Sequence, residues 1–235
     1  MAAAASVPAI SRTRGNFFAV MALAIVGIVA FGFSFTFVDN LIHPAYPRPA
    51  ILYIHAVIFS SWLALFVAQV GLIRTGQVAT HRRLGTIGIG LGAVMPCVGV
   101  ATAIAMTRLR VAHGEMDAAG SFLIPCWDML GFTTTFALAI RWRRRPDFHR
   151  RLMYMATAIL TAAAWGRMPF LDHAEWFYSG VDLLIAIAAL RDLLVDRRIH
   201  VVYLLGLPAL ICGQFLLAAV RWSDWWLATA PGLFR

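Results

Sequence analysis

The stretch HRRLGTIGIGLGAVMPCVGVATAIAM (residues 81–106) decides the class of fold. Two arginines at its start precede an apolar run that exceeds the roughly 20 residues an α-helix needs to span a bilayer. Similar runs recur along the chain, and none alternates apolar and polar residues as the strands of a membrane barrel do. The sequence therefore predicts an all-α integral membrane protein.

Composition supports this class. The chain has 235 residues, of which 61% are hydrophobic and 13% charged, whereas a soluble domain carries roughly twice that charged fraction. All basic residues are Arg, and the formal net charge is +9. Without a Lys, the chain cannot form the Schiff base of a retinal protein. Since the arginines lie in short loops between apolar runs, membrane topology explains them better than a nucleic-acid partner does.

The apolar runs predict about seven transmembrane helices in a single membrane domain, residues 17–220. A short N-terminal tail (1–16) precedes this domain, and an aromatic interfacial tail (221–235) with three Trp follows it. Charged residues interrupt the sixth run. The expected spans are residues 17–38, 51–73, 84–106, 120–140, 152–170, 176–195 and 201–220.

The distribution of Arg predicts the orientation. Most arginines lie in the N-terminal tail and in the second-to-third, fourth-to-fifth and sixth-to-seventh loops, which all face one side of the membrane. Because cytoplasmic loops carry the excess of Arg and Lys, this side is the cytoplasm. We therefore expect a multi-pass protein of the bacterial inner (plasma) membrane, with its N-terminus in the cytoplasm and its C-terminus outside.

A four-residue stretch, His-Arg-Arg-Leu, occurs twice, as HRRLG at 81–85 and HRRLM at 149–153. Each copy opens a span on the cytoplasmic side, and each follows a helix-start signal, Thr80 or Asp147. The second and third spans and the fourth and fifth spans therefore look like two copies of one hairpin. We expect these two hairpins to form a four-helix core.

The two copies also predict an anion site. A helix N-terminus offers unpaired N–H groups, and arginines add fixed positive charge. Anionic lipid headgroups of the cytoplasmic leaflet are one expected partner, besides the bilayer itself. A cofactor or substrate with carboxylates or phosphates is the other. The residues concerned are His81, Arg82, Arg83, His149, Arg150 and Arg151.

With these two stretches, the chain resembles a family of bacterial multi-spanning membrane proteins of unknown function. The resemblance covers about residues 50–170 and implies the helical architecture. It lends no activity, because the family has none to transfer. The matching residues are His55, Gln69, HRRLG at 81–85, Trp127, HRRLM at 149–153, and Arg167 with Pro169.

Four ionisable residues lie inside expected spans: His55, Asp128, Arg167 and Asp182. A charge in the bilayer interior is costly and indicates a functional site by default. From chain direction and helical rise, all four fall in the outer half of the membrane. Trp127 and Trp165 adjoin two of them and are expected to wall a pocket. This set predicts an outward-facing site for a small ligand or a proton, or else a structural charge network.

Two alternatives remain open. His81 and His149 have matching positions and are candidate ligands of a b-type haem, with nearby arginines for its propionates. Asp128 or His55 is a candidate general base in a membrane enzyme that acts on a lipid-soluble substrate. The sequence favours a non-enzyme and assigns no catalytic residue. It also indicates no metal-ion site, since Cys97, Cys126 and Cys212 lack ligand spacing.

Overall fold

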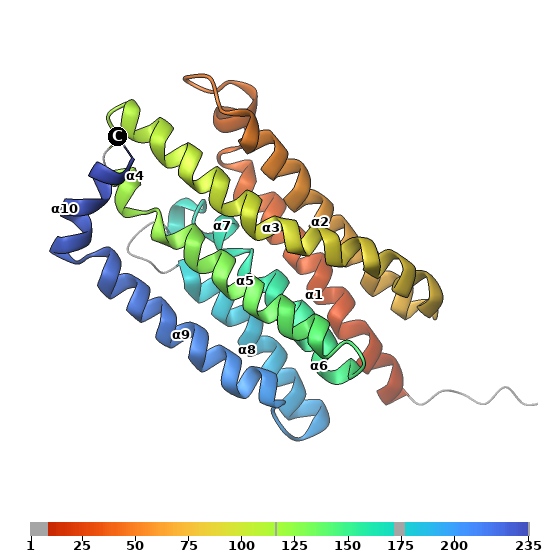
Figure 1. Cartoon of the computed structure of the whole chain (residues 1–235). Helices are drawn as coiled ribbons and strands as arrows, with labels where there is room; N and C mark the ends of the chain where they lie inside the picture. Colours follow the sequence, from red (N-terminus) through yellow and green to blue (C-terminus); the bar gives the residue numbers. More distant parts are fainter. Residues whose placement is uncertain (1–8, 116, 172–176, 235) are drawn as a thin grey trace, which may run out of the picture.

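The structure is a computed structural model that describes residues 9–115, 117–171 and 177–234, with side chains from residue 16 onward. Every regular element in these ranges is helical (Figure 1). Residues 1–8 of the expected N-terminal tail lie outside the described residues. The α-helices are α1 (Ala9–Ser34), α2 (Ala50–Arg74), α3 (Val78–Ala112), α4 (Asp117–Gly120), α5 (Leu123–Arg141), α6 (Pro146–Ile159), α7 (Ala162–Trp165), α8 (Phe177–Asp196), α9 (Val201–Arg221) and α10 (Asp224–Leu233). A π-helical turn, η1 (Val38–Ile42), and a 3-10 turn, η2 (Pro169–Leu171), complete the set.

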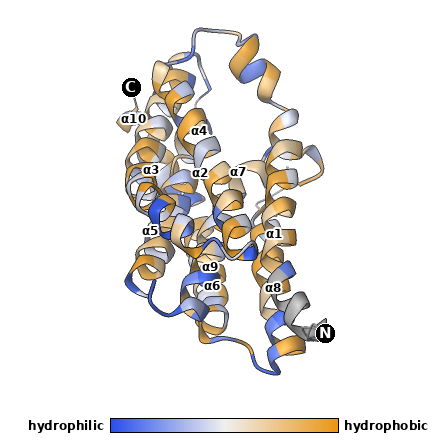
Figure 2. Ribbon diagram, turned by 90° about the vertical axis from the view of Figure 1, so that its right-hand side faces the viewer, coloured by the Kyte–Doolittle hydropathy of each residue, from blue (hydrophilic) through white to orange (hydrophobic). Residues whose placement is uncertain are grey.

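Five helical segments within the described residues are long and apolar enough to cross a membrane. Most residues along these segments are hydrophobic, which is the pattern of a membrane-embedded protein (Figure 2). The longest, α3, has 35 residues; at about 1.5 Å per residue it exceeds a hydrocarbon core of about 30 Å. The five are Asn16–Ser34, Ala50–Arg74, Val78–Ala112, Asp117–Arg141 and Val201–Arg221.

The expected fifth and sixth spans are not among these five, so the count of seven stays a prediction. The run expected at 152–170 is broken, because α6 ends at Ile159 and the short α7 and η2 follow. The run expected at 176–195 forms the continuous helix α8. That helix carries Asp182, Arg191, Asp192 and Asp196, and its charge lowers its hydropathy.

The two expected hairpins pack as neighbours, α2 against α3 and α5 against α6. They differ in form, however, since α3 has 35 residues and α6 has 14. The main buried cluster also extends beyond four helices and includes side chains of α1, α8 and α9. A core made of two equal copies is therefore not confirmed. Instead α6 lies deepest, with almost every residue from Arg151 to Ile159 buried.

The loops at 75–77, 142–145 and 197–200 lie at one end of the bundle, which we call the arginine-rich end (Figure 1). The first helical turns of α3, α6 and α9 begin there. The opposite end holds α4 and α10. The C-terminal tail expected to lie at the interface forms α10, where Trp226 is buried and donates a hydrogen bond to the Gly120 carbonyl at 3.1 Å. Trp222 and Trp225 are exposed.

Glycines let large side chains of neighbouring helices approach closely. The stripe of small residues on α3 is covered in this way, Gly92 by the Phe136 ring and Gly99 by Met129. Small residues on one helix face allow such close packing between helices. The tightest backbone approach is elsewhere, where Gly32 of α1 lies directly against the main chain of Ala164 in α7.

Replacing Gly32 by Ala is therefore expected to destabilise the bundle by about 1–3 kcal/mol. The new Cβ would clash with main-chain atoms of Ala164, which cannot move aside by a change of rotamer as a side chain can. Gly27→Ala on the same helix is the matched control, since a Cβ there meets nothing within 4 Å; it should change stability by less than about 1 kcal/mol. SDS-induced unfolding in mixed micelles measures both variants. Equal effects would contradict the packing described for α1 and α7.

Candidate functional site

The two His-Arg-Arg stretches meet at the arginine-rich end. His81 lies in the first turn of α3 and His149 in the first turn of α6. Their ring centroids are 6.5 Å apart, and the ring planes are inclined by 82°. Residues that are 68 positions apart in the sequence thus face each other across two helix starts.

The ring nitrogens of this pair have different partners. Nδ1 of His149 lies 2.9 Å from the Ala139 carbonyl oxygen at the end of α5. Because a carbonyl only accepts, this contact assigns the proton of neutral His149 to Nδ1 and leaves Nε2 basic. Nδ1 of His81 is buried without a hydrogen bond among the described residues. The main chain of Gln69 in α2 lies close to the same ring.

The arginines of the two stretches separate into exposed and buried groups. Arg82, Arg83 and Arg150 are exposed, as lipid headgroup contacts require. Arg151 is only 3% exposed. Because its side chain is buried, an anionic headgroup at this end meets the other three arginines rather than Arg151.

Arg151 forms a bidentate ion pair with Asp192 of α8. Nε and Nη2 donate to the two carboxylate oxygens at 2.6 and 2.9 Å, and Asp192 is 1% exposed. Arg191 also donates to Asp192, at 2.9 Å, and to Asp196, at 2.8 Å. The sequence did not lead us to predict this network. The group of charges that interrupts the sixth apolar run was the feature that could have indicated it.

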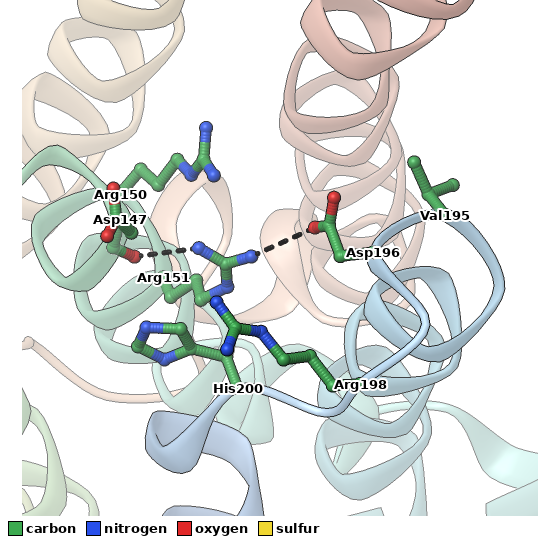
Figure 3. A pocket seen from close by; sticks show the side chains of 7 residues that line it. All are labelled: Asp147, Arg150, Arg151, Val195, Asp196, Arg198 and His200. Carbon is green, nitrogen blue, oxygen red and sulfur yellow. Dashed lines mark hydrogen bonds and ion pairs between the residues drawn. The ribbon is translucent and has the colours of Figure 1, made fainter.

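A cavity of about 350 Å³ opens beside this network (Figure 3). Arg151 crosses it, with one side of its guanidinium toward the Asp147 carbonyl and the other toward Asp196. Arg150 and Arg198 have no ion pair among the described residues. The lining residues are Asp147, Arg150, Arg151, Val195, Asp196, Arg198 and His200.

Asp128, expected in the ligand site, lies between α5 and α8. Its side chain is 7% exposed, and the Tyr178 hydroxyl donates to Oδ1 at 2.9 Å. The neighbouring Trp127 packs its ring onto Gly213 of α9. Tyr178 was not singled out from the sequence, because it precedes the charged part of α8 and carries no charge itself.

Asp182 lies one helical turn beyond Tyr178 on α8, and Gln214 of α9 donates to its Oδ1 at 3.0 Å. Each carboxyl group is therefore bound by a neutral side chain. Together, Asp128, Tyr178, Asp182 and Gln214 define a polar cluster shared by α5, α8 and α9. We call it the carboxyl cluster.

His55 and Arg167 lie outside the carboxyl cluster. Arg167 places its guanidinium over the Phe33 ring of α1, 4.2 Å from the centroid, and donates to the Ala163 carbonyl. His55 stacks on Phe59, with centroids 4.0 Å apart, and its Nδ1 is buried and unpartnered among the described residues. In the described ranges no hydrogen bond or ion pair joins two of the four expected ionisable residues.

Trp165 is a packing residue. Its ring lies on Gly180 of α8, and its Nε1 donates to the Thr161 hydroxyl at 3.1 Å. In the described part of the chain, no group of three or more His, Cys, Asp or Glu side chains is placed to hold a metal ion. The cysteines are unpaired.

Comparison with known proteins returns no match at any level. No protein-family model matches the chain. No curated protein and no solved structure matches it either. The resemblance drawn from the two His-Arg-Arg stretches therefore stays a prediction.

His200 gives the arginine-rich end a pH dependence. Its Nδ1 caps α9 by accepting the Val202 N–H at 3.3 Å, which requires neutral imidazole. Burial, and then the charge of Arg151, lower the pKa of His200 below the ordinary 6.5. A depressed histidine pKa contributes stability above pH 6.5 that is lost as the pH falls through the folded-state pKa.

We therefore expect the unfolding free energy to fall as the pH drops below 6.5, and to fall less steeply in His200→Asn, whose amide oxygen keeps the cap without titrating. SDS unfolding at a series of pH values measures the two slopes. Parallel slopes in the two proteins would rule out this role for His200.

Proposed function

We propose that the chain is a multi-spanning membrane protein that binds or translocates a proton or a small ligand at the carboxyl cluster. One observation carries the proposal: Asp128 is buried between α5 and α8, and its partner is the neutral hydroxyl of Tyr178. Buried charges are ordinarily paired with an opposite charge. Neither Asp128 nor Asp182 has a basic partner among the described residues.

The missing counter-charge indicates the kind of ligand. A carboxylate in the membrane interior costs several kcal/mol unless its charge is offset. With Tyr178 and Gln214 as donors, that offset has to come from a bound proton or a cationic group. Because Asp128 and Asp182 reach the cluster from different helices, a ligand or proton held there bridges α5 and α8.

His55 and Arg167 provide a second, separate polar position in this proposal. The guanidinium of Arg167 has no carboxylate partner in the described ranges and suits an anionic group of a ligand. Trp127 and Trp165 are the proposed walls of the two positions, and their rings lie on Gly213 and Gly180. This arrangement replaces direct salt bridges among the four residues with two neighbouring sites.

The orientation belongs to the same proposal. The arginine-rich end faces the cytoplasm of a bacterial inner membrane, where Arg82, Arg83 and Arg150 contact anionic headgroups. The carboxyl cluster then lies toward the outside. The excess of Arg at one end of the bundle supports this arrangement.

Asp128→Asn tests the proposal, because the amide oxygen still accepts the Tyr178 hydrogen bond while the group no longer takes up a proton. Infrared difference spectra across a pH step should show the carbonyl band of a protonated carboxyl group in the unaltered protein. The band should be lost in Asp128→Asn and kept in Asp224→Asn, a substitution in the first turn of α10.

Translocation is read separately, in liposomes that enclose a pH-sensitive dye. The proposal expects Asp128→Asn to slow relaxation of an imposed pH gradient relative to Asp224→Asn. An unaltered infrared band in a folded Asp128→Asn protein would contradict proton binding at this carboxyl group.

A further inference from the structure

We propose that His81 and His149 are the two axial ligands of a haem iron held at the arginine-rich end. This site lies apart from the carboxyl cluster and does not rest on the function proposed above. It gives a role to two histidines from distant parts of the chain whose rings lie close together.

The two rings are separated by about the distance that a metal ion bound between them requires. Two imidazoles that bind one metal ion from opposite sides, with bonds of about 2 Å, have ring centres roughly 6 Å apart. The observed centroid distance is 6.5 Å. Ring pairs elsewhere in the bundle range from Trp62 and Phe132 at 5.2 Å to Phe17 and Tyr154 at 6.5 Å. The His81–His149 distance lies within this range and also suits one metal ion bound between the rings.

The hydrogen bond of the His149 ring is of the kind that a metal-bound imidazole makes. A metal-bound imidazole typically donates its other N–H to a carbonyl or carboxylate, which fixes the ring and the tautomer. His149 does this through Nδ1 to the Ala139 carbonyl. The Gln69 main chain lies close to the His81 ring, whose Nδ1 is buried. Nε2 of His149 is then available to a metal ion, whereas Nδ1 of His81 makes no hydrogen bond among the described residues.

The number of ligands points to a macrocycle. A metal ion held by side chains alone usually has three or four protein ligands. Within the described residues no third His, Cys, Asp or Glu joins the pair. A porphyrin supplies four equatorial nitrogens and leaves two axial positions, which is the number of histidines present.

The charges around the pair match the periphery of haem. Haem carries two propionate carboxylates, and Arg guanidinium groups bind carboxylates in bidentate fashion. Arg82 and Arg83 follow His81, Arg150 follows His149, and all three are exposed at the same end of the bundle. Gly85 lies one turn after His81, and the side-chain amide of Gln69 lies 3.6 Å from the place a Cβ would take there.

Absorption spectra of the full-length protein, purified in detergent from cells supplied with a haem precursor, test the proposal. We expect a Soret band and, after reduction with dithionite, the sharp visible bands of iron with two imidazole ligands. His81→Ala and His149→Ala should each lose this spectrum. Removing a residue that only hydrogen-bonds to a ligand typically lowers the affinity for the metal roughly 10–100-fold, and removing the ligand itself costs more.

His200→Ala is the matched control, since His200 lies at the same end and caps α9 rather than facing the pair. It should keep the spectrum. His149→Met distinguishes loss of the ligand from misfolding, because a thioether also binds haem iron. This variant should retain pigment with shifted bands. A colourless protein that stays colourless after addition of haemin would overturn the proposal. So would pigment whose spectrum is the same in all four variants.

Discussion

The buried ion pair between Arg151 and Asp192 fixes how α6 lies against α8. Both side chains are almost wholly buried, and two hydrogen bonds set their mutual orientation. A buried guanidinium left without its carboxylate is strongly unfavourable, so the helices cannot rotate independently. The pair also fixes the rest of α6, where Tyr154 donates to the Leu184 carbonyl at 2.7 Å. His149 lies on the same helix, two residues before Arg151.

The two ends of the bundle differ in how their charged side chains are paired. At the arginine-rich end, two arginines are paired with two aspartates, and two imidazoles lie close together with exposed guanidinium groups nearby. Toward the other end, carboxyl groups meet only neutral donors, Tyr178 and Gln214. A network with balanced charges holds the helices in register. A carboxyl group without a counter-charge is where a proton or ligand has an energetic reason to bind.

The sequence predicted the helical class and the presence of helix starts close to the two His-Arg-Arg stretches. It did not predict which arginine turns inward, because Arg150 and Arg151 look alike until Asp192, on another helix, is placed. The expected meeting of His55, Asp128, Arg167 and Asp182 rested on depth, which the rise per residue gives. Rotation about each helix axis is set by packing between helices, so residues at one depth still face different neighbours.

A double-mutant cycle on Arg151 and Asp192 tests the central claim most directly. Each single change, Arg151→Met or Asp192→Leu, breaks the bidentate pair and leaves the three remaining charges of the network unbalanced. It should therefore lower the unfolding free energy by about 3–5 kcal/mol. The double variant buries two apolar side chains instead and should recover most of that loss. Strong coupling in SDS unfolding is therefore the expected result. Additive losses in the double variant would show that the pair does not hold α6 against α8.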